Sequence, residues 1–417
     1  MRRLPALLVV ILALVVGVGV GVLAGKVVLG PMTSTAEVAP TSAAAGGVTA
    51  ASTAPGPAST ASEAPSASPS PTPAPTPVLV PDPLDGVLVS PALAKRHVVA
   101  VMIDDLWAAR PQSGLSSASV VWQAPAEGGI PRYMALFSEG SPPAVGPIRS
   151  SRLYFIAWAA EWNAVYMHVG GSPQALAVLD SPQGAGSVVW NADQISLGAT
   201  YMWRIATRAA PHNVYSSAKA MQQLVKALHA PASMPYTAAW QFAADPPLDQ
   251  LPTSGSISVP YPQNVISYAY DPATNSYPRT VTSEGREVDA GTGTRIAPKN
   301  VVVIYMSFGP LNDGSNKGRL EAQFTGSGKA LVFNNGTLTK ATWKKASMTA
   351  PTLLYGPDGQ PVTLTVGQTF VQVVPLGTTV AYKLGRLPGP GTSPLPSGAV
   401  PPSPSPLGLV GDWRQVL

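Results

Sequence analysis

Two neighbouring carboxylates follow an apolar segment in the first half of the chain. Asp104 and Asp105 come directly after residues 98–103, an uninterrupted apolar run that predicts a buried strand. The carboxyl ends of strands are where ligand sites gather in α/β sheets. Paired carboxylates at such an end can bind a divalent cation or divide the roles of acid and base. The alternative is a turn in which the aspartates hydrogen-bond to their own backbone.

A third carboxylate, Glu127, stands beside Gly128 and Gly129 between two strand-like runs. Glycines permit a close approach between backbone and ligand, so this segment is a second candidate for acid or base chemistry. A flexible hairpin loop is the alternative explanation of the same residues. We retain both Asp104 and Glu127 as candidate catalytic carboxylates.

Two histidines, His168 and His212, are the candidate catalytic partners of these carboxylates. His168 ends an apolar strand-like run, which also fits a buried, hydrogen-bonded histidine. His212 can act as a general base or share a metal with His168. Neither histidine has a second ligand at short range in the sequence, so no metal site is predicted.

Basic residues open the helix that we predict at 150–162. Arg149 and Arg152 are three positions apart and share one face of that helix. Free N–H groups and guanidinium groups together make a site for an anion. The alternative is that these arginines pair internally with Asp104, Asp105 or Glu127.

The turn Gly170-Gly171-Ser172 leads from a predicted strand into a helix that begins with Pro173. Its backbone N–H groups can hold an anion. The turn lacks the lysine of a phosphate-binding loop and the glycine spacing of a dinucleotide fold, so no cofactor is predicted. The complete set of predicted ligand-binding residues joins this turn to basic and amide side chains: Arg110, Arg132, Arg149, Arg152, Gly170, Gly171, Ser172, Arg208 and Asn213.

Two folded regions must position these residues. Residues 84–250 alternate strand-like and helix-like segments, which predicts an α/β or α+β domain. Residues 255–385 show only strand and turn patterns, with a hairpin at Asn335-Gly336, and predict a smaller antiparallel all-β domain.

The β-rich region also contains aromatic residues between polar ones. Tyr268, Tyr270 and Tyr277 lie close in sequence to Asp271, Arg279 and Asp289. Tyrosines in such alternation can stack on sugar rings, although one face of a sheet is the commoner explanation.

The two ends of the chain differ in composition from these regions. Residues 4–25 form an unbroken apolar run behind Arg2 and Arg3. At about 1.5 Å per residue this run spans roughly 33 Å, a full bilayer core. Residues 1–29 therefore predict a single-pass anchor, or an uncleaved signal, with the rest of the chain outside, and a long cleaved signal peptide is the alternative. Residues 30–83, rich in Ala, Pro, Ser and Thr, predict a disordered linker, and 386–417 predict a disordered tail.

Composition excludes several classes of protein. The 417 residues carry a formal net charge of only +5 and no basic run flanks an aromatic surface, so no nucleic-acid partner is predicted. Cysteine is absent, which excludes disulfides, thiolate nucleophiles, iron–sulfur clusters and a thioether lipid anchor.

Taken together, these residues resemble the YerB-like bacterial lipoprotein family. The motifs that carry the resemblance lie in both regions: Val101-Met102-Ile103-Asp104, residues 109–115, Glu127-Gly128-Gly129-Ile130 with Arg132, residues 146–150 with Arg152, residues 168–173, Ala210-Pro211-His212-Asn213, Tyr270-Asp271, residues 300–303 and Ala341-Thr342-Trp343-Lys344. The resemblance covers residues 85–380 and implies an exported, surface-anchored protein of two domains with no settled activity.

The chain departs from this family in two respects. It has no lipobox cysteine, so a membrane-spanning helix would replace the lipid anchor. A position that is often His in the second domain of the family is Glu287 or Val288 here, so no role is carried over to it.

The predictions describe a membrane-anchored extracytoplasmic protein that binds an anionic cell-envelope ligand. Carboxylates of peptidoglycan peptides and phosphates of teichoic-type polymers are the candidate ligands. One alternative is an envelope hydrolase or lyase, in which Asp104 or Glu127 acts as acid and base and His168 or His212 assists. Another is a structural, partner-binding module that uses the β-rich region.

Overall fold

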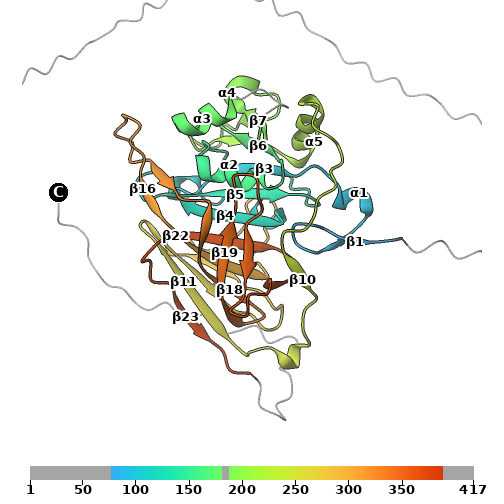
Figure 1. Ribbon diagram of the computed structural model, residues 1–417. Coiled ribbons are helices and arrows are strands. Elements are labelled where there is room, and N and C mark those ends of the chain that lie inside the picture. Colours follow the sequence, from blue (N-terminus) through green and yellow to red (C-terminus); the bar gives the residue numbers. More distant parts are fainter. Residues whose placement is uncertain (1–76, 181–186, 388–417) are drawn as a thin grey trace, which may run out of the picture. The chain divides into compact units, whose positions relative to one another are not determined.

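The computed structural model describes residues 77–180 and 187–387, and all of them belong to one compact unit, 73–417 (Figure 1). The predicted anchor 1–29, the linker as far as residue 76 and the tail from residue 388 lie outside the described residues. Within 77–180 and 187–387, no helix is long and apolar enough to cross a membrane. The described part begins with a short antiparallel pair, β1 (Val80–Pro81) and β2 (Leu88–Val89).

A single ten-stranded sheet runs through both predicted regions (Figure 1). Its strands, from one edge to the other, are β20 (Leu353–Tyr355), β19 (Thr337–Lys345), β18 (Gly326–Asn334), β15 (Asn300–Met306), β22 (Thr369–Pro375), β4 (Val120–Pro125), β5 (Pro131–Phe137), β3 (Val99–Asp104), β6 (Val165–His168) and β7 (Trp190–Asp193). The two regions meet where β22 lies parallel beside β4. The two predicted regions thus share one sheet, because both strands are buried along nearly their whole length and have neighbours on each side.

A second sheet has five antiparallel strands, all from the second region. Their order is β14 (Gly285–Arg286), β13 (Arg279–Val281), β12 (Asn264–Ala269), β11 (Gly255–Tyr261) and β23 (Ala381–Leu384). The described residues between 255 and 385 form strands and turns, as the sequence indicated. A purely antiparallel pairing was a wrong expectation, because β22 is parallel to both β15 and β4.

Helices cover the two faces of the ten-stranded sheet near β3 to β7, in the upper part of Figure 1. They are α1 (Pro91–Ala94), α2 (Leu153–Ala160), α3 (Pro173–Leu179), α4 (Gln194–Leu197) and α5 (Ala218–Ala227). On one face, Trp158 of α2 stacks on Trp122 of β4 with ring centroids 4.4 Å apart. On the other face, Met221 and Leu224 of α5 pack against Val99 and Val101 of β3.

The five-stranded sheet packs its inner side chains against the part of the ten-stranded sheet that comes from the second region. Ile257 and Ile266 share this core with Val301, Val303 and Phe333. The molecule therefore has layers of sheet on sheet in the second region and of helix, sheet and helix in the first.

The helix predicted at 150–162 is shorter than expected. It begins at Leu153, and Arg152 is its N-terminal cap residue in an extended conformation, with φ −135°. Arg149 and Arg152 therefore do not share a face of its first turn, and that expectation was wrong. Arg149 instead lies in the irregular segment that joins β5 to α2.

Candidate functional site

The carboxylate of Asp104 lies at the end of β3, where two later segments of the chain reach it. The N–H of Asp104 donates to the Pro147 carbonyl at 2.8 Å, and Ile148 forms an isolated bridge with Ile103. On its other side the 145–148 segment pairs with β9 (Val214–Tyr215), because the N–H of Ile148 donates to the Val214 carbonyl. Arg149 and His212 are thereby brought to the same carboxylate.

Arg149 forms an ion pair with Asp104 but keeps its outer nitrogens open. Its Nε atom lies 2.7 Å from Oδ2 of Asp104, without the alignment of a hydrogen bond. No partner of its two terminal nitrogens is found among residues 77–180 and 187–387, and the side chain is 24% exposed. Burial lowers the pKa of Arg149 more than the charge of Asp104 raises it. The guanidinium thus has unused hydrogen-bonding capacity for an anion.

His212 contacts Asp104 through one ring nitrogen. Its Nδ1 atom lies 2.7 Å from Oδ2 of Asp104, and the side chain is 14% exposed. No partner of Nε2 is found in the described ranges of the chain. A carboxylate that orients one ring nitrogen while the other is free is the arrangement of a general base.

Glu127 is held between two arginines next to this group. One carboxylate oxygen accepts from Arg132 and the other from Arg152, and Arg132 also donates to the Ser150 carbonyl at 2.9 Å. Burial alone would raise the pKa of Glu127, but the two guanidinium groups lower it below the usual value. The carboxylate therefore stays ionised, which disfavours Glu127 as a general acid.

These six residues form one charged group, which we call the β3-end site: Asp104, Glu127, Arg132, Arg149, Arg152 and His212. Arg132 of β5 is the direct cross-strand neighbour of Asp104. The charges of Arg132 and Glu127 both act on Arg149. Three guanidinium groups thus face two carboxylates, which leaves a positive charge in excess.

Arg110, which was predicted to bind a ligand, lies in a different place. Its side chain is 3% exposed and forms ion pairs with Asp105 and with Glu284. Burial opposes the charge of Arg110, yet the neighbouring carboxylates raise its pKa above the usual value. The terminal nitrogens of this arginine are engaged inside the protein, and its Nε is buried without a hydrogen-bond partner. Its predicted role in ligand binding therefore has no support in its contacts.

Asp105 and Arg110 belong to a buried polar network between the two sheets. Arg279 of β13 is fully buried and donates to Glu287, to Tyr268 at 3.1 Å and to Gln123 of β4 at 2.7 Å. Gln123 in turn donates to Asp105 at 2.5 Å. Burial raises the pKa of Asp105 against the opposing charges of Arg110 and Arg279.

The second-region tyrosines are buried as well, so sugar stacking on them is ruled out in this fold. Tyr268, Tyr270 and Tyr277 are at most 5% exposed and point into the core between the sheets. The alternative explanation, one face of a sheet, fits Tyr268 of β12, whereas Tyr270 and Tyr277 lie outside the strands. The sequence did not indicate that Arg279 joins them in the interior.

His168 is structural in its contacts. It is fully buried, with Nδ1 2.9 Å from the Gly170 carbonyl and Nε2 2.8 Å from Oδ1 of Asn191. Both ring nitrogens are used, so His168 has none free for proton transfer, and the prediction of a buried histidine describes it better than the catalytic one.

The turn that follows His168 is also occupied by the chain itself. The N–H of Gly170 donates to the carboxylate of Asp193 at 2.8 Å, and Ser172 caps α3 by accepting from the N–H of Ala175. Gly171 pairs with Ser151 in an isolated bridge. An external anion at this turn would have to displace Asp193.

The last two predicted residues brace the loop that carries His212. Arg208 donates to the carbonyls of Ala109 and Pro111 at 2.7 and 2.8 Å. Asn213 accepts from Arg204 of β8 (Trp203–Arg204) at 2.6 Å. Both side chains position the loop rather than project from it.

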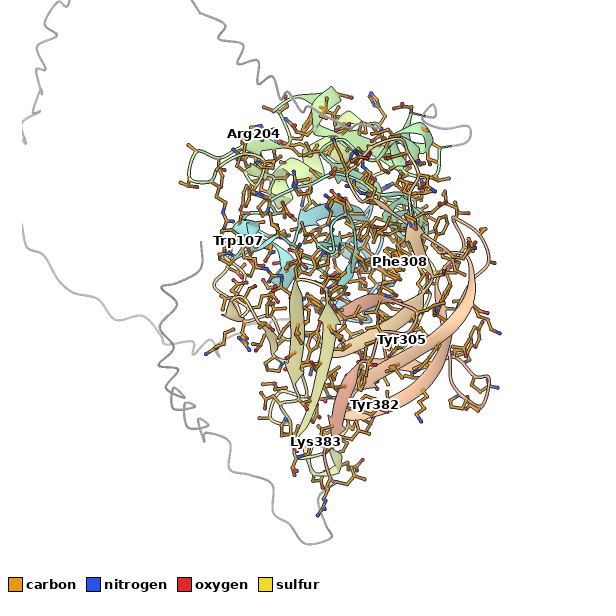
Figure 2. The ribbon with its side chains drawn as sticks, turned by 90° about the vertical axis from the view of Figure 1, so that its left-hand side faces the viewer. Trp107, Arg204, Tyr305, Phe308, Tyr382 and Lys383 are labelled. Atoms are coloured by element: carbon orange, nitrogen blue, oxygen red, sulfur yellow. The ribbon has the colours of Figure 1, made fainter. Side chains whose placement is uncertain are left out.

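One exposed aromatic residue near the β3-end site was missed. Trp107 opens a short 3₁₀ helix, Trp107–Ala109, and is 70% exposed. The N–H of the preceding residue, Leu106, donates to Asp104 at 3.0 Å. Figure 2 shows Trp107 and Arg204 on the same flank of the protein. A lone Trp three positions after Asp104 was the only sequence signal.

Three cavities of the described part have none of the predicted arginines in their linings. They measure about 320 Å³ beside α1 and α5, about 440 Å³ on the outer face of the five-stranded sheet, and about 20 Å³ beside α3. Ser172 lines the smallest, which has room for little more than a water molecule. The β3-end site is partly exposed, since the side chains of Glu127, Arg149 and His212 are 25%, 24% and 14% exposed.

Comparison with known proteins places both regions in one family. Residues 84–231 match the model described as "Protein of unknown function (DUF3048) N-terminal domain", and residues 257–371 match its C-terminal domain. The chain is 30% identical over 302 residues to "Putative lipoprotein YerB" of Bacillus subtilis (strain 168), which covers 70% of this chain and 86% of that protein.

A solved structure agrees with this sequence match. The crystal structure of YerB protein from Bacillus subtilis superimposes with a TM-score of 0.65 at 25% sequence identity, over 73% of this chain and 99% of that one. Two matching domain models and a relative aligned over most of its length show that this chain belongs to the DUF3048 family.

Proposed function

We propose that this protein is anchored in the membrane and binds an anionic ligand of the cell envelope at the β3-end site. The observation that carries the proposal is Arg149, whose side chain is 24% exposed and whose terminal nitrogens have no partners in the described residues. The three guanidinium groups of the site outnumber its two carboxylates, and the remaining positive charge adds long-range attraction for an anion. Carboxylates of peptidoglycan peptides and phosphates of teichoic-type polymers share this chemistry.

The proposed ligand contacts are fewer than the sequence indicated. Arg149 would bind the anion directly, and Arg132 and Arg152 would act through their charge, because Glu127 already engages them. Trp107 would supply an exposed ring on which a sugar of the same polymer can stack. Arg110, Arg208 and the Gly170 turn are left out of this set.

Membrane anchoring is supported from two sides. The relative from Bacillus subtilis carries the name of a lipoprotein. This chain has no cysteine, but it has the apolar run at 4–25, which is long enough to span a bilayer. A single-pass anchor would hold the folded part outside the membrane by way of the linker.

The test is retention of cell-wall material by the full-length protein. Purified sacculi with teichoic polymers, and the same sacculi stripped of them, distinguish phosphate from peptide carboxylate as the bound group. Arg149→Gln should lower retention about tenfold, since one charge-assisted contact is worth 1.4 kcal/mol or more. Arg286→Gln removes an exposed arginine of β14 and is the matched control. Equal retention by both variants would refute the proposal.

An envelope hydrolase or lyase is the second candidate, and the contact of Asp104 with His212 favours it. Here His212 would remove a proton through Nε2 while Asp104 stabilises the resulting imidazolium. His212→Gln should then abolish release of soluble wall fragments and leave retention of sacculi unchanged. If the wild-type protein releases no soluble wall fragments, the enzyme candidate fails. The retention measured for Arg149→Gln then decides the binding proposal alone.

A further inference from the structure

The cavity of about 320 Å³ lies at the end of β3 opposite the β3-end site. Val99 begins β3 and pairs with Phe137 at the end of β5, and both residues form the floor of the cavity. Asp104 is five residues further along β3, roughly 17 Å away at about 3.3 Å per residue. The cavity is therefore separate from the site of the proposed function.

Its walls come from two helices and are mostly apolar. Leu93 of α1 and Met221 and Val225 of α5 face the space above the floor. Figure 1 shows α1 and α5 on the same side of the molecule, on its right. A cavity of 300 Å³ or more with apolar walls is within the range of small-molecule sites.

Two cations stand at this cavity without acidic partners. Arg96 follows α1, and Lys226 lies in the last turn of α5. No carboxylate oxygen of residues 77–180 and 187–387 lies within 4.0 Å of either side chain, and no acidic residue lines the cavity. Arg96 only donates to the Glu139 carbonyl at 3.5 Å, although its charge also favours the ionised form of Asp82.

The two buried polar side chains of the cavity, His97 and Ser138, are already engaged, and Gln222 of α5 lines it with an exposed, uncharged amide. His97 is buried, with its ring nitrogens 2.8 Å from the Pro231 carbonyl and 2.9 Å from the Asn163 carbonyl. The hydroxyl of Ser138 donates to the carboxylates of Asp82 and Glu139, neither of which lines the cavity. Recognition of a polar ligand group would therefore come from Arg96 and Lys226 and would select a negative charge.

We propose that this cavity binds a free single-chain carboxylate, with its alkyl chain between α1 and α5 and its carboxylate between Arg96 and Lys226. Burial of the chain against Val99, Phe137 and Met221 supplies the apolar contacts. The two cations supply charge-assisted hydrogen bonds at the opening. Such an amphiphile satisfies both halves of the lining, which neither a neutral hydrocarbon nor a small inorganic anion does.

The direct test is a titration of full-length protein in lipid nanodiscs with octanoate. The probe is the ¹³C-methyl signal of Met221, identified through its loss in Met221→Leu, because this side chain lines the cavity. The expected result is a saturable shift with octanoate, at least tenfold weaker binding of octanol and no saturable shift with octyltrimethylammonium. Absence of a saturable shift with octanoate, or equal binding of octanol, overturns the proposal.

Substitution of the two cations tests their charge separately from the apolar contacts of the cavity. Arg96→Gln and Lys226→Gln should each weaken octanoate binding by about tenfold and leave octanol binding unchanged. Lys219→Gln removes an exposed lysine of the same helix outside the cavity and should have no effect. An equal loss in Lys219→Gln would show nonspecific attraction to the helix and refute the assignment.

Filling the cavity should abolish binding without touching either cation. Val225→Trp places a larger ring in the space beside α5, and circular dichroism shows whether this variant folds. If it does not fold, Ala92→Trp fills the cavity from the exposed end of α1. Octanoate binding of wild-type strength by a folded filling variant would refute the proposal.

Discussion

The Nδ1 atom of His212 lies 2.7 Å from the carboxylate of Asp104, although 108 residues separate the two in the chain. The intervening segment 145–148 makes this contact possible, because it pairs with the end of β3 on one side and with β9 on the other. Arg149 ends the same segment and reaches the same carboxylate oxygen. Asp104 therefore holds together three parts of the first region as well as the charges of the β3-end site.

Asp104→Asn should destabilise the protein more than any change at its partners. The substitution removes the charge that compensates Arg149 and leaves one amide oxygen where two oxygens serve the Leu106 N–H and His212, at a cost of about 1–3 kcal/mol in the free energy of unfolding. Urea denaturation of the full-length protein measures this loss. His212→Gln removes only one of the two contacts and should cost less. A free energy of unfolding for Asp104→Asn within about 0.5 kcal/mol of the wild-type value would contradict the stabilising role of this carboxylate.

Arg279→Met tests the buried network between the sheets. Arg279 is fully buried beside Glu287, and its removal leaves this buried carboxylate with only the longer ion pair to Arg110 at 3.6 Å. The expected loss is about 3–5 kcal/mol in the free energy of unfolding, again by urea denaturation.

The double substitution Arg279→Met with Glu287→Leu is the control for that experiment. It removes both charges, so it should recover part of the stability lost in Arg279→Met. The contrary result is a double variant that loses more free energy of unfolding than Arg279→Met and Glu287→Leu lose together. That result would show that the apolar contacts of Arg279, rather than its charge, hold the sheets together.

The local elements were predictable because their signals are local. The apolar run at 98–103 gave β3 with Asp104 at its end, as expected. Asn335 and Gly336 have φ of 51° and 66°, the left-handed conformations that a two-residue hairpin between β18 and β19 requires. Ser172 caps α3, which starts at Pro173 where the sequence placed the helix start.

The pairing of strands across the two regions was not predictable in the same way. β22 and β4 are mostly apolar and almost wholly buried, and such strands fit beside any similar neighbour, so their patterns do not reveal that they lie together. The interior position of Arg279 was hidden for a related reason. Its partner Gln123 is 156 residues away, and an alternating strand has the same pattern whichever sheet covers its inner face.

For the candidate site, the residue types were informative and their grouping was not. Asp104, Glu127, Arg149 and His212 were all predicted and do lie together with Arg132 and Arg152. Arg110 and His168 looked equivalent in sequence, but each is satisfied by neighbours of its own. Arg149 and His212 differ from these two residues in being 24% and 14% exposed, whereas Arg132 and Arg152 are as buried as Arg110. Such exposure depends on contacts between distant segments.

Glu127→Gln should change how stability depends on acid pH. The pKa of Glu127 is lowered in the folded protein by Arg132 and Arg152 against the effect of burial, so its ionised form stabilises the fold. That contribution is present above the ordinary glutamate value of 4.5 and is lost as the pH falls through the lower folded value. The difference in melting temperature between wild type and Glu127→Gln should therefore shrink in acid. Glu321→Gln, an exposed glutamate without an ion pair among the described residues, is the control and should show no such trend.

Asp85→Asn should have the opposite dependence on pH. Asp82, Asp85 and Glu139 lie within 4.8 Å of one another near the start of the described chain. Burial, with the charge of Glu139, raises the pKa of Asp82 to about 6 and that of Asp85 to about 8. A carboxyl whose pKa is raised on folding favours the folded state only while it is protonated, so wild-type stability should fall as the pH rises through these values.

Asp85→Asn keeps an acceptor for the N–H of Val87 without the charge, and its melting temperature should fall less than that of wild type between pH 5 and about 9. Asp249→Asn, at an exposed aspartate, should follow wild type, and a parallel decline in all three proteins would show that Asp85 is already ionised in the fold at neutral pH.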